Sequence, residues 1–346
     1  MKEPKFIIFN DAHLKKENQD PVLLSVLHMV KYAVTHSIKS IVFAGDLFHF
    51  RKAQEESLFT TCTAIFEAIR EAGIHLYFFA GNHDKTSYTS YTSFLDHYRY
   101  HPNTTFTDRL LTLEIEGISV TLLPFFDDSM LVPMLEEAEG TDLLISHFEL
   151  KGSNHLGHIS EKETITPKML RKWTKTYLGH YHNTQEVTPN IIHLPSLRQN
   201  DHGENNLKGF SVIYDDLSYE IIKGVFKEFV TLKLDIEDLD TETIKSLIIE
   251  HENSPNTVRF EISGSDEKLK ALDVRLFDNT GIDLKKKYDK EYDYDDPEVK
   301  DAPKVVHQFN KESIEEEFRN FCEKKGYNYE FGKVLLDEFL TKKRIK

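Results

Sequence analysis

Five short clusters of carboxylate, amide and imidazole side chains follow apolar segments of this sequence. They are Asp11-Ala12-His13, Gly45-Asp46-Leu47-Phe48-His49, Gly81-Asn82-His83-Asp84, Ser146-His147 and Gly179-His180-Tyr181-His182. In an extended segment, residues two apart point to the same side, so Asp11 and His13 can address one point, as can His180 and His182. Together these oxygen and nitrogen donors suffice for two metal ions that share one carboxylate.

Asp46 is the natural bridging carboxylate, because it stands alone directly after a glycine at the end of an apolar run. One ion is then expected to take Asp11, His13, Asp46 and His182, and the other Asp46, Asn82, His147 and His180. Two cations about 4 Å apart would clamp a phosphate, lower the pKa of a bridging water and favour in-line attack. Imidazole and oxygen ligands without thiolate favour Mn, Fe or Zn over Ca.

Three further polar residues have expected roles beside the metals. His83 adjoins Asn82 but is not needed as a ligand, so it is placed to protonate the leaving oxygen. Asp84 is expected to hold the His83 imidazole in one tautomer, and His49 to contact a phosphate oxygen. Each motif alone more often marks a turn, a helix cap or an exposed strand end. The five motifs in this order favour a metal site.

The apolar pattern predicts an α/β scaffold of two sheets that brings these clusters together. Strand-like runs alternate with helical patterns over the first half of the chain. A hairpin is expected over 110–125, and a helix over about 53–72 that stops at Gly73. The other expected strands are Phe6–Phe9, Ile41–Ala44, Leu76–Ala80, Asp142–Ser146 and Tyr177–Gly179. Ligands bind at the carboxyl ends of strands in such sheets. A separate α+β unit is expected after about Val225.

Composition limits the class of protein. The chain has 346 residues, 39% of them hydrophobic, and only two cysteines, Cys62 and Cys322. The first apolar run is too short for a signal peptide and no window approaches a membrane span, so we expect a soluble, cytoplasmic protein. A formal net charge of −15 argues against a polyanionic partner, unless bound cations reverse the local field.

The five motifs together resemble the calcineurin-like metallophosphoesterases, and the resemblance covers Lys5 to about Tyr214. The runs Ser146-His147-Phe148-Glu149 and Leu194-Pro195-Ser196-Leu197-Arg198 are similar to those of SbcD-type nucleases, the nuclease subunits of SbcCD and of the MRN complex. Within that group, the chain is most similar to the recombination endonuclease subunits of large bacteriophages. The Leu-Pro-Ser segment departs from the family because it lacks the usual Gly-Ser pair.

The resemblance implies a two-sheet sandwich with helices outside, and a Mn²⁺-dependent enzyme, with Mg²⁺ as the other candidate. It implies 3′-to-5′ exonuclease and single-strand endonuclease activity on DNA. It also implies a homodimer with an SbcC-like coiled-coil ABC ATPase as partner. A phage-encoded chain would be located in the host cytoplasm. The expected divisions are a nuclease domain (1–224), a capping, DNA-binding domain (225–284), a linker (285–304) and a helical ATPase-binding segment (305–346) with apolar stripes.

Two other functions compete with the nuclease. A metallophosphoesterase for a small nucleotide or a phosphoprotein would use the same ions, but it has no need of a capping unit, a linker and terminal helices. A scaffold with a decayed metal site would have lost ligands, whereas every ligand position here is filled. For a nuclease, we expect some of the cations in loops near the motifs to contact the DNA backbone; these are Arg51, Lys52, Lys85, Arg99, Lys151 and Lys162.

Overall fold

The structure is a computed structural model. It describes residues 2–155, 157–161 and 163–288, together with seven residues between 315 and 333. Residues 1–287 form one compact unit and residues 288–346 a second. The site and its supporting elements belong to the first unit.

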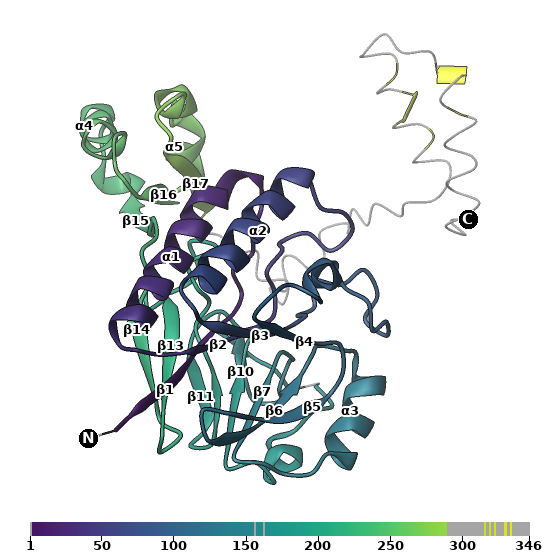
Figure 1. Cartoon of the computed structure of the whole chain (residues 1–346). Coiled ribbons are helices and arrows are strands. Elements are labelled where there is room, and N and C mark those ends of the chain that lie inside the picture. Colours follow the sequence, from purple (N-terminus) through teal and green to yellow (C-terminus); the bar gives the residue numbers. More distant parts are fainter. Residues whose placement is uncertain are drawn as a thin grey trace. The chain divides into compact units, whose positions relative to one another are not determined.

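One six-stranded sheet carries the N-terminal strand near its centre (Figure 1). Its strands, in spatial order, are β14 (Tyr219–Lys223), β13 (Gly209–Tyr214), β1 (Pro4–Phe9), β2 (Ser40–Ala44), β3 (His75–Phe79) and β4 (Thr104–Thr107). Strands β1 to β4 run parallel, whereas β13 is antiparallel to both of its neighbours. The carboxyl ends of β1, β2 and β3 therefore lie at the same edge of the sheet.

The second six-stranded sheet is also mixed. Its order is β11 (Gln185–Thr188), β12 (Ile191–His193), β10 (Lys175–Leu178), β7 (Leu143–Ser146), β6 (Ile118–Leu123) and β5 (Leu111–Ile115). Strands β6, β7, β10 and β12 are parallel, and β5 and β6 form the predicted hairpin. Consequently β7 and β10 also end side by side.

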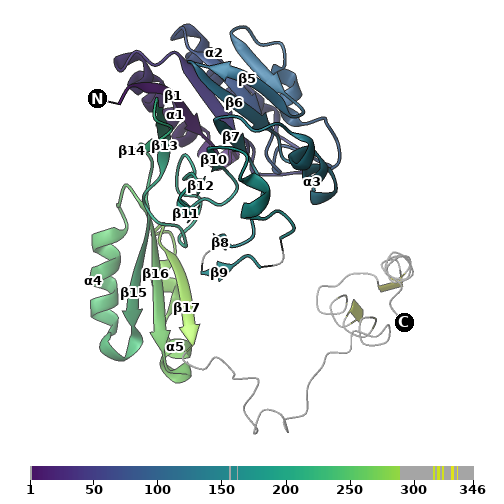
Figure 2. The same ribbon diagram turned by 90° about the horizontal axis from the view of Figure 1, so that it is seen from below.

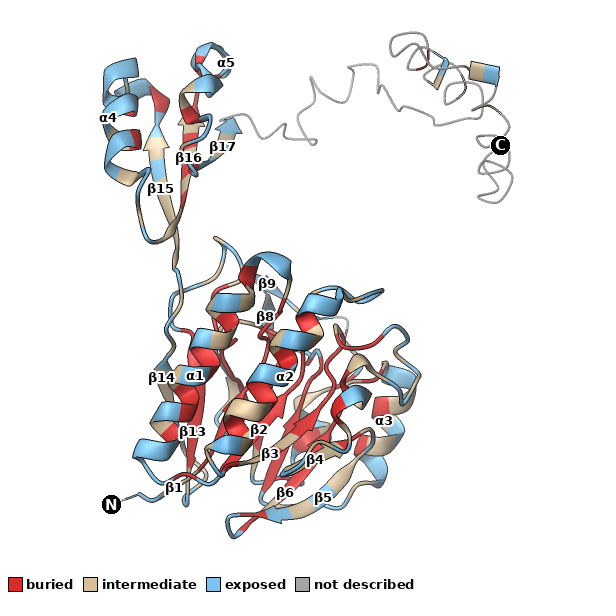
Figure 3. Ribbon diagram, turned by 45° about the horizontal axis from the view of Figure 1, so that its top comes forward, coloured by how far each residue is buried: buried red, intermediate tan, exposed pale blue. Residues whose placement is uncertain are grey.

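Helices cover the outer faces of the two sheets, and the sheets pack on each other. Along β1, Ile7 and Phe9 belong to the core beneath α1 (Gln19–Thr35) and α2 (Glu56–Glu71), whereas Phe6 and Ile8 belong to the core between the sheets. This alternation follows from the two-residue period of a strand. Helix α3 (Asp128–Glu137) covers the second sheet. In Figure 3 the central strand β2 is red, since all of its residues are buried. The arrangement confirms the predicted α/β sandwich with helices outside.

Short elements complete the larger part of this unit. Helix α2 ends at Glu71, two residues before Gly73, which has a φ of 70° as expected of a glycine that ends a helix. A small hairpin joins β8 (Asn154–His155) and β9 (His158–Ile159). The 3-10 helices in this part span Lys16–Asn18, Phe94–Tyr98 and Pro167–Leu170, and those in the small α+β unit span Ile236–Asp238 and Val274–Phe277.

A small α+β unit follows, as predicted (Figure 2). It contains a three-stranded sheet in the order β15 (Phe229–Asp235), β16 (Thr257–Gly264) and β17 (Asp283–Tyr288), with helices α4 (Thr241–His251) and α5 (Asp266–Ala271). The sequence pattern over 266–277 predicts a single helix, but this segment divides into α5 and a 3-10 turn at Val274–Phe277. The predicted linker began at residue 285, but β17 continues to Tyr288. Two of its residues form ion pairs with β16, since Lys285 pairs with Glu261 at 2.9 Å and Asp283 with Arg259 at 2.6 Å.

The predicted linker beyond residue 288, and most of the predicted helical segment 305–346, lie outside the described residues. The seven described residues of that segment are helical, and the rings of Phe318 and Tyr329 contact each other with centroids 5.9 Å apart. No helix in the described part of the chain is long and apolar enough to cross a membrane.

Candidate metal centre

All seven predicted metal ligands follow the carboxyl ends of β1, β2, β3, β7 and β10, and the structure brings them together. On one side, His13 Nε2 lies 2.9 Å from His182 Nε2 and 3.7 Å from both Asp11 Oδ1 and Asp46 Oδ2. On the other side, His147 Nε2 lies 3.3 Å from Asp46 Oδ2. Asp46 thus stands between the two groups of nitrogen donors.

Asn82 and His180 complete the second group. The Asn82 amide lies 3.1 Å from both His147 Nε2 and His180 Nδ1, and 3.2 Å from Asp46 Oδ2. All three atoms can act as acceptors. Without a cation, the two N–H groups of the amide nitrogen could serve only two of them at once. A cation bound among them would draw the amide oxygen instead.

Backbone strain concentrates at this site. Asp11, His13, Asp46 and His180 are four of the nine non-glycine residues in the described chain with positive φ, at 51°, 48°, 61° and 84°. Such conformations cost about 1–3 kcal/mol each and persist where the surroundings enforce them. Here the loops after β1 and β2 are bonded to each other, since Asp11 N donates to Gly45 O at 2.9 Å. The folded core therefore holds the ligand loops in shape.

His147 is oriented by its backbone surroundings. A Cβ atom on Gly45 or Gly179 would lie 2.8 or 2.7 Å from His147 Nδ1, so glycine at both positions makes room for the ring. In that slot His147 Nδ1 donates to the Ala44 carbonyl at 2.9 Å. The lone pair of Nε2 is consequently left facing Asp46 and Asn82, the tautomer that a metal ligand requires.

Glu204 is a site residue that the sequence analysis missed. It accepts a hydrogen bond from His182 Nδ1 at 2.5 Å and pairs with Lys208 at 3.1 Å, and both side chains are buried. A carboxylate behind a histidine fixes the ring and leaves Nε2 for a ligand. Glu204 lies in a loop after Gly203 rather than directly after a strand, so the strand-end pattern did not mark it.

The charges of the cluster fit a divalent cation. Burial alone would raise the pKa of Asp11, but the facing imidazoles of His147, His13 and His182 hold it well below its ordinary value. Burial alone would also raise the pKa of Asp46, but nearby imidazoles, chiefly that of His147, lower it. Although burial disfavours the charged form of His147, the two carboxylates raise its pKa to about 9. The cluster thus attracts positive charge.

Two buried polar atoms of the cluster also fit a bound cation. Asp11 Oδ1 and His13 Nδ1 have no hydrogen-bond partner among the described residues, which is costly for buried polar groups. The donor atoms of Asp11, His13 and His182 lie close enough together to hold one cation, and so do those of Asp11, Asp46 and His147. Carboxylate, amide and imidazole donors without a thiolate fit a transition-metal ion of intermediate hardness.

The structure corrects the predicted role of Asp84. Its carboxylate accepts from the backbone amides of Asp46 at 2.8 Å, Gly81 at 2.9 Å and Phe48 at 3.0 Å. It therefore ties the loops after β2 and β3 together, and the predicted bond from Asp84 to His83 is wrong. In a tight turn the side-chain direction is set by local backbone bonds rather than by sequence adjacency.

His83 and His49 lie beside the metal cluster, as predicted. His83 Nδ1 faces the carbonyl oxygen of His49 at 2.5 Å, and its Nε2 accepts from Arg51 Nη2 at 3.1 Å. The His49 ring lies 5.5 Å from that of His13, centroid to centroid. His13, His49 and His83 also form a third group of donors close enough to hold a cation.

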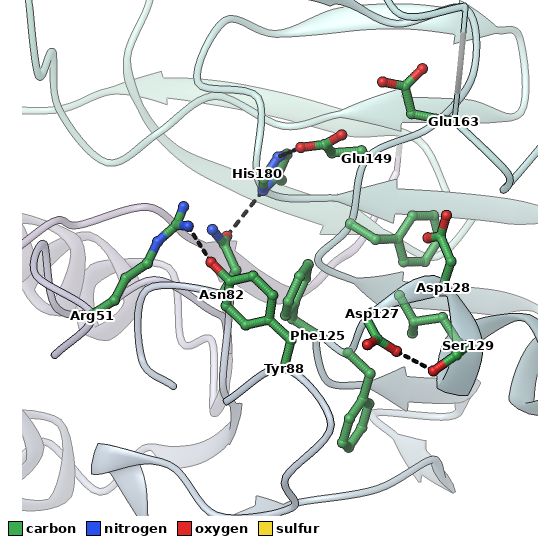
Figure 4. Close-up of a pocket in the computed structure, with 13 residues that line it drawn as sticks. Arg51, Asn82, Tyr88, Phe125, Asp127, Asp128, Ser129, Glu149, Glu163 and His180 are labelled. Atoms are coloured by element: carbon green, nitrogen blue, oxygen red, sulfur yellow. Dashed lines mark hydrogen bonds and ion pairs between the residues drawn. The ribbon is translucent and has the colours of Figure 1, made fainter. Parts of the chain in front are cut away.

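Two cavities open at the cluster. One of about 540 Å³ has aromatic walls from Tyr88 and Phe125, shown in Figure 4, and the other has about 670 Å³ and includes His13, His83 and His182. Of the cations predicted to contact DNA, Arg51 lines both cavities, whereas Lys52, Lys85, Arg99 and Lys151 line neither. Lys85 is buried and donates to the carbonyls of Ser90 and Phe125, and Arg99 pairs with Asp96 and Asp108. Lys162 lies outside the described residues.

The sequence profile of the Calcineurin-like phosphoesterase family matches residues 4–216, so the chain belongs to that family. It is accordingly a phosphoester hydrolase of a family that binds divalent metal ions. Among curated proteins, the chain is 24% identical to Exonuclease subunit 1 of Enterobacteria phage T4 over 195 residues, which are 53% of this chain and 56% of the phage protein. The match thus spans about half the length of that relative.

Solved structures include a distant neighbour with the printed description "GAP50 the anchor in the inner membrane complex of Plasmodium". It aligns with a TM-score of 0.38 and 10% sequence identity, covering 65% of this chain and 89% of that one.

Proposed function

We propose that this protein is the SbcD-type nuclease subunit of a DNA-processing complex, with 3′-to-5′ exonuclease and single-strand endonuclease activity. The observation that carries this proposal is the similarity to a phage exonuclease subunit, joined to a family domain whose strand ends converge on one metal-binding cluster. The two cavities also share Arg51, Glu149, Glu163 and His180 as lining residues. A site that continues from one cavity into the next suits a polymeric substrate.

In the proposed centre one ion is held by Asp11, His13, Asp46 and His182, and the other by Asp46, Asn82, His147 and His180. Two divalent ions, Mn²⁺ by resemblance, would supply charge neutralisation at the phosphate and a water molecule of lowered pKa. The protein's own part is orientation. Ala44 O holds His147 and Glu204 holds His182, each through Nδ1, so that both rings direct Nε2 into the cluster.

His83 is the proposed general acid for the leaving oxygen. Burial lowers the pKa of His83, and the bond that its Nδ1 can donate to the His49 carbonyl offsets part of that lowering. Nε2 is then the atom that transfers the proton. Arg51 donates to that same Nε2, so we infer that Arg51 turns to the phosphate when substrate binds. His49 contacts a phosphate oxygen in this arrangement.

The partner and domain assignments complete the proposal. Residues 225–284 serve as the capping, DNA-binding domain, and residues 305–346 bind the base of an SbcC-like ABC ATPase. The phage relative is named as a subunit, which supports assembly with a partner. The nuclease chains pair as a homodimer in this proposal.

Incubation with labelled DNA tests the function. The protein with Mn²⁺ should shorten a single strand and a duplex stepwise from their 3′ ends, and EDTA or the Asp46→Ala substitution should abolish the products. The alternative is a phosphatase for a small nucleotide or phosphoprotein. Hydrolysis of p-nitrophenyl phosphate esters without any cleavage of DNA would favour that alternative and overturn the nuclease assignment.

A further inference from the structure

A cavity with an unusual charge lies where the small α+β unit meets the two-sheet core. Its volume is about 280 Å³, and it is lined by Lys15, Glu17, Asn18, Pro21, Arg198, Asn200, Lys227, Phe229 and Thr257. Three of these side chains are cationic and one is a carboxylate, although the chain carries a formal net charge of −15. The cavity therefore attracts an anion where most of the surface would repel one.

Backbone contacts fix the position of Lys227. Ser25 Oγ donates to Val225 O at 2.7 Å, and Phe229 N donates to Gln199 Oε1 at 2.9 Å. Lys227 lies between these two anchored residues, and Gln199 directly follows Arg198. The segment that enters the small unit is thus held against the loop that carries Arg198.

The guanidinium of Arg198, which lines this cavity, has N–H groups that form no hydrogen bond in the part of the chain that the structure describes. Its side chain is 7% exposed, Nη1 donates to Asn200 Oδ1 at 3.1 Å, and the buried Nε has no hydrogen-bond partner among the described residues. None of Arg198, Lys15 and Lys227 forms an ion pair with a residue that the structure describes. A buried guanidinium with unused N–H groups matches the oxygens of a phosphate in geometry and charge.

The cavity continues toward the metal cluster. Lys15 and Asn200 line both this cavity and a neighbouring one of about 360 Å³, whose wall includes His180 and His182. We propose that the cavity binds a backbone phosphate of single-stranded DNA, a short way along the strand from the phosphate that is cleaved. The proposal rests on the nuclease function. A small phosphoester would occupy the metal cluster alone, so this subsite specifies a polynucleotide.

Lys227→Gln tests the subsite in the full chain, because Lys227 is exposed and its loss leaves the core intact. Lys223→Gln is the matched control, since Lys223 is also exposed but already pairs with Glu228 at 2.6 Å. Anisotropy of a labelled single strand of about 30 nucleotides is followed with EDTA from about 50 to 200 mM salt. Lys227→Gln should weaken binding and reduce the salt slope by about 0.7, the value for one lost phosphate contact.

Hydrolysis of bis(p-nitrophenyl) phosphate with Mn²⁺ should be the same in both variants, because that ester does not reach the cavity. The subsite is overturned if Lys227→Gln binds the strand with the same affinity and salt slope as Lys223→Gln. If the wild type cleaves the strand in that case, the nuclease function still stands. A wild-type protein that hydrolyses bis(p-nitrophenyl) phosphate but neither binds nor cleaves the strand overturns both.

Discussion

Replacing Glu204 by glutamine tests whether a buried carboxylate holds His182 in the metal centre. Glu204 accepts from His182 Nδ1 at 2.5 Å and from the backbone N–H of Asn200 at 3.1 Å, and pairs with Lys208 at 3.1 Å. Glutamine keeps the shape of the side chain and one acceptor oxygen but removes the negative charge. The substitution therefore separates charge from packing.

Two effects follow from the contacts. Loss of the carboxylate behind a metal-binding histidine lowers metal affinity about 10- to 100-fold, or roughly 1.4 to 2.7 kcal/mol. The substitution also leaves Lys208, whose side chain is fully buried, without its counter-charge. Removing one partner of a buried pair costs about 3–5 kcal/mol of unfolding free energy. Lys208 still donates to Asn183 Oδ1 and His182 O, so we expect the lower end of that range.

A second substitution distinguishes the two effects. Glu204→Gln with Lys208→Met removes both charges, so the unfolding free energy should return toward the wild-type value while Mn²⁺ affinity stays reduced. Urea denaturation in EDTA measures the first quantity and calorimetric titration the second. Glu67→Gln, which breaks a half-exposed ion pair with Arg70, is the control and should change neither. Wild-type Mn²⁺ affinity in the double variant would refute the role of Glu204.

Three other outcomes are expected. His83→Ala should retain metal but lose about 10²- to 10⁴-fold in DNA cleavage rate, measured in single-turnover assays; cleavage at the wild-type rate would remove His83 from the mechanism. Deleting residues 305–346 should preserve nuclease activity and abolish co-purification with the ATPase, whereas a truncated chain that still forms the complex would contradict this assignment. Phe6→Ala, at a fully buried position between the sheets, should lower the unfolding free energy by about 3–5 kcal/mol, and a loss near zero in urea denaturation would be inconsistent with the observed packing.

The sequence predicts correctly those helices and strands that local residue patterns define. Buried parallel strands such as β2 are apolar on both faces, and the polar residue that follows, Asp46, marks where each strand ends. The sequence does not reveal strand β17 because the partners of its charged residues lie on β16, where Glu261 pairs with Lys285 and Arg259 with Asp283. Composition alone made this segment resemble a linker.

The site was predictable as far as strand ends define it. Asp11 lies two residues after the end of β1 and His147 one residue after the end of β7, so the topology of the sheets brings them together. The carboxylate of Glu204 reaches His182 from 22 residues away through a loop, and no periodic pattern encodes such a contact. The direction of the Asp84 side chain depends on three backbone amides from two loops, and only the folded turn supplies them.

Anomalous diffraction from Mn²⁺-soaked crystals tests the metal centre most directly. Two peaks are predicted, one beside Asp11, His13 and His182 and the other beside Asn82, His147 and His180, with Asp46 between them. Asp46→Ala crystals should lose both peaks. A single peak in the wild type, or a peak in the group formed by His13, His49 and His83 with none beside Asp46, would contradict the proposed two-metal centre.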